Sequence, residues 1–66
     1  MQIFFNGQPQ EVQDKVTVAK LLEQFELQPR FVAVEVNREL IPRDFHTNHV
    51  LQPDDHLEVV TLVGGG

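Results

Sequence analysis

The chain has 66 residues, a formal net charge of −5, 41% hydrophobic residues and no cysteine. This length predicts one small domain without room for a deep substrate pocket, which argues against a self-contained enzyme. The lack of cysteine excludes disulfides, zinc fingers, iron–sulfur ligation and thiol catalysis. The acidic balance, with only scattered Lys and Arg residues, argues against nucleic-acid binding.

The N-terminal segment shows no basic region ahead of a long apolar run, so we expect no signal peptide. No apolar stretch approaches the roughly 20 residues that a membrane-spanning helix needs. We therefore expect a cytoplasmic protein that does not associate with membranes.

The alternation of side chains over Met1–Phe5 predicts a half-buried strand. Asn6-Gly7 is a strong signal for a hairpin turn, and a short second strand is expected to return over Gln10–Gln13. Pro9 places the start of this second strand at a sheet edge or inside the turn.

A helix is expected next, with Thr17 as its N-cap. Its apolar positions follow the i, i+3, i+4, i+7 spacing of an amphipathic helix: Val18, Leu21, Leu22 and Phe25. Pro29 is expected to end this element.

The rest of the chain predicts three more strands, over Val32–Val36, Leu40-Ile41 and Leu57–Leu62. A turn at 37–39 is expected to join the first two. A loop with a helical turn over 45–51 and a turn at 53–55 are expected to lead to the last strand. A leading hairpin, a helical crossover and a final strand that returns to the sheet indicate an α+β fold of the β-grasp type. We expect four to five strands wrapped around one main helix in residues 1–62, followed by a flexible tail at 63–66.

The final strand divides its side chains between two faces. Leu57, Val59 and Thr61 are expected to face the helix, which leaves Val60 and Leu62 on the open face of the sheet, together with Phe4 from the first strand. Contiguous exposed apolar groups usually mark an interface, so we interpret this face as a docking surface.

Few residues suggest chemistry of their own. His46 and His49 have the spacing of a shared metal site, but a third ligand is not evident, and we expect surface histidines in a polar loop and no metal. Asp54-Asp55 is interpreted as a turn former and not as a catalytic pair. Arg43 is either a partner contact or a solvated charge, and the sequence does not decide between the two.

The sequence ends on Gly64-Gly65-Gly66, directly after an apolar run. Glycines have no side chain, so this segment is a thin strand of backbone that fits a narrow channel and presents the Gly66 carboxylate. The alternative is a frayed terminus without a function.

The opening MQIFFNG, the segment VAVEVNRELIPRDF (32–45) and the ending DHLEVVTLVGGG (55–66) resemble the sulfur carriers of thiamine biosynthesis, the ThiS family. The resemblance extends over nearly the whole chain, and the element from Val36-Asn37 to Pro42-Arg43 is fairly specific to that family. The chain departs from the family pattern at two places. Phe45 stands where the family often has Trp, and we expect it to keep the role of an aromatic plug. Pro53-Asp54 stands where Gly-Asp is frequent, and we expect it to keep the turn.

The resemblance implies that the protein is a co-substrate and not an enzyme, with no bound cofactor. A ubiquitin-activating-type enzyme would use ATP and Mg²⁺ to adenylate Gly66, and a persulfide donor of the cysteine desulfurase or rhodanese type would convert it into a thiocarboxylate. Thiazole synthase would then receive the sulfur. The residues assigned to this scheme are the reactive Gly66, the tail residues Gly64 and Gly65, and the partner contacts Phe4, Val60, Leu62, Val63 and Arg43.

Three alternatives stay open. A small subunit of molybdopterin synthase would use the same tail chemistry, but that family is usually longer. A ubiquitin-like modifier would form an isopeptide through Gly66, although such modifiers are often made with residues beyond the Gly-Gly pair. A pure interaction module would use the open face of the sheet and leave the tail inert.

Overall fold

The computed structural model describes residues 1–62, and the chain begins with a β-hairpin. Strand β1 (Gln2–Phe5) pairs antiparallel with β2 (Gln8–Glu11). Asn6 and Gly7 both have positive φ, 50° and 83°, as a two-residue Asn-Gly turn requires. β2 starts earlier than expected and contains Pro9, which is tolerated because β2 is an edge strand.

Helix α1 (Val18–Gln24) begins at the predicted N-cap: the Thr17 hydroxyl accepts a hydrogen bond from the Lys20 N–H at 3.1 Å. The expectation that Pro29 ends the helix is wrong. Glu26 adopts a left-handed φ of 59°, and the Leu27 N–H donates to the Leu22 carbonyl at 2.8 Å. These two features form a Schellman-type C-terminus, so the helix closes well before the proline. Pro29 instead begins a short 3₁₀ helix, η1 (Pro29–Phe31).

The second half of the chain supplies three strands: β3 (Val32–Val36), β4 (Glu39–Ile41) and β5 (His56–Thr61). A 3₁₀ helix, η2 (Arg43–Phe45), follows β4. The five strands form one mixed sheet in the order β2-β1-β5-β3-β4, in which β5 is parallel to β1 and antiparallel to β3. The chain therefore returns its last strand to the centre of the sheet.

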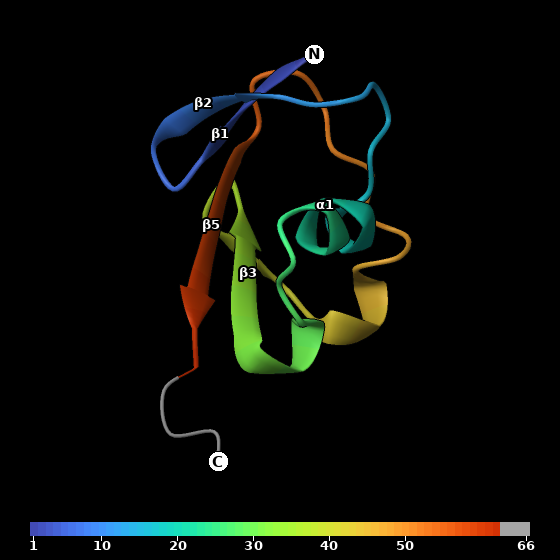
Figure 1. Ribbon diagram of the computed structural model, residues 1–66, viewed down its shortest axis with the longest axis vertical. Coiled ribbons are helices and arrows are strands. Elements are labelled where there is room, and N and C mark those ends of the chain that lie inside the picture. Colours follow the sequence, from blue (N-terminus) through green and yellow to red (C-terminus); the bar gives the residue numbers. More distant parts are fainter. Residues whose placement is uncertain (63–66) are drawn as a thin grey trace.

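The core lies between α1 and one face of the sheet (Figure 1). The side chains without any exposed surface include Ile3, Val18, Leu21, Leu22, Val34 and Leu57. Phe5 and Phe25 pack against this core, and their ring centroids are 4.5 Å apart. This α+β arrangement of a sheet around one helix confirms the predicted β-grasp architecture. In the part of the chain that the structure describes, no helix has the length and hydrophobicity needed to cross a membrane.

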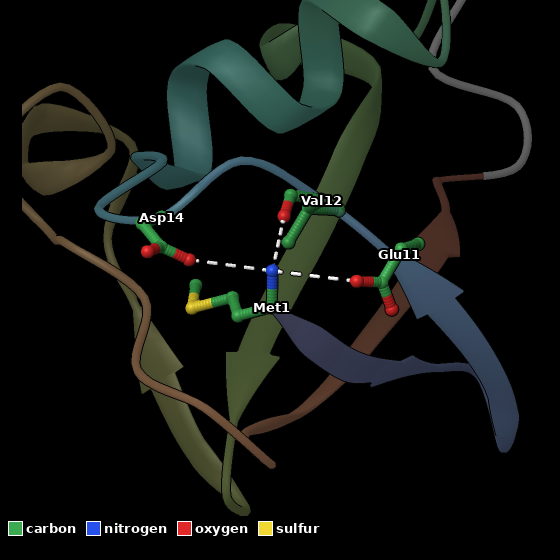
Figure 2. A network of polar contacts seen from close by, with 4 residues as sticks. All are labelled: Met1, Glu11, Val12 and Asp14. Carbon is green, nitrogen blue, oxygen red and sulfur yellow. Dashed lines mark hydrogen bonds and ion pairs between the residues drawn. The ribbon is translucent and has the colours of Figure 1, made fainter.

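The N-terminal ammonium group anchors the start of β1 to the segment that follows β2 (Figure 2). It donates a hydrogen bond to the Val12 carbonyl at 2.7 Å and lies 3.5 Å from a Glu11 carboxylate oxygen and 3.3 Å from one of Asp14. Glu11 and Asp14 are highly exposed, so their two ion pairs contribute little to stability. The Val12 N–H also donates to the Met1 carbonyl at 2.8 Å, so two hydrogen bonds between Met1 and Val12 hold this end of the sheet.

Candidate functional site

Strand β5 positions the segment that leads to the glycine tail. It is the central strand of the sheet, and its arrow in Figure 1 points away from the N-terminal end of the molecule. Beyond β5 the Leu62 N–H donates to the Phe31 carbonyl at 2.8 Å, so pairing with the β3 side continues to the last described residue. The predictions for Val63, Gly64, Gly65 and Gly66 lie outside the described residues.

The two faces of β5 have the predicted polarity as far as Val60, but Thr61, which was expected to face the helix, is exposed at the end of the strand. Leu57 and Val59 are 0% and 9% exposed, whereas Val60 and Leu62 are 57% and 48% exposed. This confirms that the helix covers the face of Leu57 and that Val60 lies on the opposite face. The reason is the two-residue period of a strand, which separates neighbouring side chains.

Strand pairing shows which other side chains share the face of Val60. Val60 is opposite Ala33, Glu58 is opposite Glu35, and Glu35 is also opposite Leu40 of β4. Residues directly opposite each other point to the same side of a sheet. We call this surface the open face; its members are Phe4, Ala33, Glu35, Leu40, His56, Glu58 and Val60.

Phe4 belongs to the open face through its contact with β5. It is paired with His56, and the two rings stack with their centroids 4.5 Å apart and their planes 16° apart. Phe4 is partly buried by this contact. The structure thus brings two predicted contact residues, Phe4 and Val60, onto one surface, and it adds His56, which the sequence reasoning missed.

Leu40 and Glu35 were also missed. Leu40 is 61% exposed on β4. The alternation of Val34 and Val36 already places Glu35 outward, and a register for the hairpin between β3 and β4 would have placed Leu40 beside it. These residues were missed because the register between β3 and β4 was not predicted.

Arg43 lies apart from the other predicted contact residues. It is exposed in η2, which follows the edge strand β4, whereas Phe4 lies on β1 at the other side of β5. Arg43 therefore lies on a different element from Phe4 and Val60, and its role as a partner contact stays a prediction.

Phe45 does not plug the core, contrary to the expectation. Its side chain is 57% exposed. With Leu40, Ile41 and Pro42 it lines a groove of about 290 Å³ beside β4. The neighbouring His46 is buried instead, with 3% of its surface exposed.

His46 is therefore a buried residue, and its interpretation as a surface histidine is wrong. Its Nε2 lies 3.0 Å from the Ile41 carbonyl oxygen. Because a carbonyl only accepts hydrogen bonds, Nε2 carries the hydrogen and donates it. Within residues 1–62 no group of three or more His, Cys, Asp or Glu side chains is arranged to hold a metal ion.

Asp55 forms structural contacts, as its interpretation as a turn residue predicts. One carboxylate oxygen accepts from the Asn37 side-chain amide at 2.9 Å, and the other accepts from the Gln52 N–H at 2.8 Å. These bonds join the loop before β5 to the turn between β3 and β4. Asp55 therefore helps to place the start of β5.

Comparison with known proteins places this site in a family. The family model of the ThiS family matches residues 3–66. The sulfur carrier protein ThiS of Escherichia coli (strain K12) is 32% identical, and the match covers the whole of both chains. A thiazole synthase of Magnetococcus marinus is 39% identical over all 66 residues, but this chain spans only 20% of that protein.

Structural comparison agrees with the sequence matches. The crystal structure of the thiamine biosynthesis protein ThiS from Geobacter metallireducens superposes with a TM-score of 0.87 at 29% identity, and the match covers all of both chains. A match to the family model from residue 3 to the last glycine, together with the full-length match to the E. coli protein, exceeds what a shared fold alone would give. The chain belongs to the ThiS family of β-grasp proteins.

Proposed function

We propose that this protein is a sulfur carrier of thiamine biosynthesis, and that its Gly66 carboxylate is the group that carries the sulfur. The observation that carries this proposal is the match to the ThiS family, which includes the terminal glycines. The full-length similarity to the E. coli sulfur carrier supports the same function.

The position of β5 supports the proposal in physical terms. Four residues follow Leu62 in the sequence, and an extended chain covers about 3.3–3.6 Å per residue. Gly66 can therefore reach roughly 13 Å beyond the folded domain into a recessed active site. The folded domain would supply affinity and orientation through the open face, and the glycines would supply a narrow profile.

In the proposed reaction the catalytic groups belong to partner enzymes. A carboxylate oxygen of Gly66 attacks the α-phosphorus of ATP, pyrophosphate leaves, and an acyl adenylate forms on an activating enzyme that holds Mg²⁺. The terminal sulfur of a cysteine persulfide then attacks the acyl carbon and displaces AMP. A second thiol cleaves the resulting S–S bond, which leaves a thiocarboxylate on Gly66 and a disulfide on the donor.

The absence of cysteine from the chain is consistent with this role, since no internal thiol competes for the activated carbonyl. Thiazole synthase is the proposed acceptor of the sulfur. Two relatives that bear this name, from M. marinus and Paramagnetospirillum magneticum, contain a segment similar to this whole chain within a much longer polypeptide. If the carrier transfers sulfur directly to thiazole synthase, a polypeptide that contains both would favour the transfer.

Intact mass spectrometry tests the proposal. The chain is incubated with the activating enzyme of the same genome, ATP, Mg²⁺ and a persulfide donor, and we expect one C-terminal oxygen to be replaced by sulfur. Omission of ATP and deletion of Gly66 are the controls, and both should abolish the change. An unchanged wild-type mass, or equal conversion of the shortened chain, would contradict the sulfur-carrier function. A covalent adduct on a lysine of another protein would instead indicate a modifier.

A further inference from the structure

Two carboxylates face each other at the centre of the open face. Glu35 of β3 and Glu58 of β5 are directly opposite in the antiparallel register. Both side chains are exposed and extend from neighbouring strands. Directly opposite residues have Cβ atoms about 4.5–5.5 Å apart, and like charges at this separation destabilise a sheet.

In the described part of the chain, no ion pair within 4.0 Å compensates these two carboxylates. Across residues 1–62 the ion pairs within 4.0 Å involve the N-terminal ammonium group and Lys20, and none includes Glu35 or Glu58. Arg38 lines the same surface hollow as Glu58, a space of about 360 Å³ beside the turn between β3 and β4, but forms no ion pair with it. The two carboxylates therefore lack a direct cationic partner, and a basic group of a binding partner would relieve their repulsion.

The surroundings of the pair are apolar. The next cross-strand pair along the sheet is Ala33 and Val60, and Leu40 flanks Glu35 on β4. Val60 and Leu40 are the two most exposed aliphatic side chains of this face, at 57% and 61%. A long side chain with an apolar stem and a cationic head would contact the aliphatic groups and the carboxylates at the same time.

Arginine fits this arrangement better than lysine. Its planar guanidinium group presents several N–H donors in fixed directions and bridges two carboxylates, whereas an ammonium group is a more strongly hydrated point charge. The net charge of −5 adds a long-range attraction for a basic surface.

We propose that Glu35 and Glu58 form a recognition site for an arginine of thiazole synthase, and that this contact seats the carrier for delivery of its tail. The inference rests on the proposed function and names the partner of the open face. Thiazole synthase is chosen because two proteins of that name contain a segment similar to this whole chain.

The test uses the full chain and the thiazole synthase of the same genome. The variant Glu35→Gln/Glu58→Gln removes both charges but keeps the size of the side chains. Glu23→Gln/Glu26→Gln, at the end of α1 on the other side of the sheet, removes the same charge and is the matched control. Binding is measured by calorimetry at low and high salt, and the melting temperature of each variant is recorded.

We expect the Glu35→Gln/Glu58→Gln variant to bind about tenfold or more weakly at low salt. Its affinity should also depend less on salt than that of the wild type. Its melting temperature should be equal to that of the wild type or higher, because the repulsion is gone. The control variant should retain most of its affinity. Wild-type affinity and salt dependence in the Glu35→Gln/Glu58→Gln variant would overturn the proposal.

Two further outcomes separate this inference from the proposed function. If the Glu35→Gln/Glu58→Gln variant loses affinity for the activating enzyme but not for thiazole synthase, the assigned partner is wrong. If the wild type acquires a thiocarboxylate but does not bind thiazole synthase, the inference fails and the carrier function stands. Failure of the wild type to acquire sulfur would remove the basis of both.

Discussion

The side chain of Asn6 is paired with the backbone of Val59 in the central strand. Its amide donates to the Val59 carbonyl at 3.1 Å, and its carbonyl oxygen accepts from the Val59 N–H at 2.8 Å. One side chain thus satisfies both polar backbone groups of a residue that lies 53 positions away in the sequence. The hairpin turn is thereby joined to the strand that leads to the tail.

Replacement of Asn6 by Ala should destabilise the domain by about 1–3 kcal/mol, because the backbone groups of a buried residue lose their partner. Chemical denaturation measures this change. Asn6→Gly is the control, since glycine accepts the positive φ without strain but forms neither hydrogen bond. A Gly variant as stable as the wild type would show that only the turn conformation matters at this position.

The two faces of β5 should respond differently to mutation. Leu57→Ala removes a fully buried side chain and should cost about 2–5 kcal/mol. Val60→Ser should change stability much less and should weaken binding to thiazole synthase, because Val60 is exposed. Thermal unfolding and calorimetric titration measure the two effects. Equal loss of stability in both variants would contradict the interpretation of the open face as a docking surface.

Replacement of Gly65 by Val should impair adenylation without affecting the fold. A β-branched side chain restricts φ and widens the segment that has to enter the active site of the partner. The rate of thiocarboxylate formation, followed by intact mass, should fall while the melting temperature stays that of the wild type. A lower melting temperature would indicate that the glycine is structural.

The buried His46 should be a stability residue and not a metal ligand. His46→Ala leaves a cavity and deprives the Ile41 carbonyl of its donor, so we expect a loss of about 1–3 kcal/mol. His49→Ala, at a partly exposed position three residues on, is the control and should have a smaller effect. A rise in wild-type melting temperature on addition of Zn²⁺, lost in His46→Ala, would argue for a metal site instead.

The sequence by itself determined the elements whose signals are local. The spacing of Val18, Leu21 and Leu22 predicted the helix, and Thr17 predicted its start. The Asn6-Gly7 pair predicted the first turn. The alternation in β5 predicted that Leu57 and Val59 are buried and Val60 is exposed, because a strand has a two-residue period, although it wrongly predicted that Thr61 is covered. The reactive Gly66 came from the resemblance to a family, and it stays a prediction.

The tertiary structure decided the features for which the sequence carries no clear local signal. Pro29 was a plausible end for the helix, but the left-handed Glu26 closes it earlier. His46 was expected at the surface, yet it is buried in the segment that follows β4. The periodicity of the sequence does not predict the long-range pairs. These are the parallel pairing of β1 with β5, the hydrogen bonds between Asn6 and Val59, and the pairing of Glu35 with Glu58. Local periodicity reports which side of an element is apolar, whereas strand order and register are set by the packing of the whole sheet around one helix.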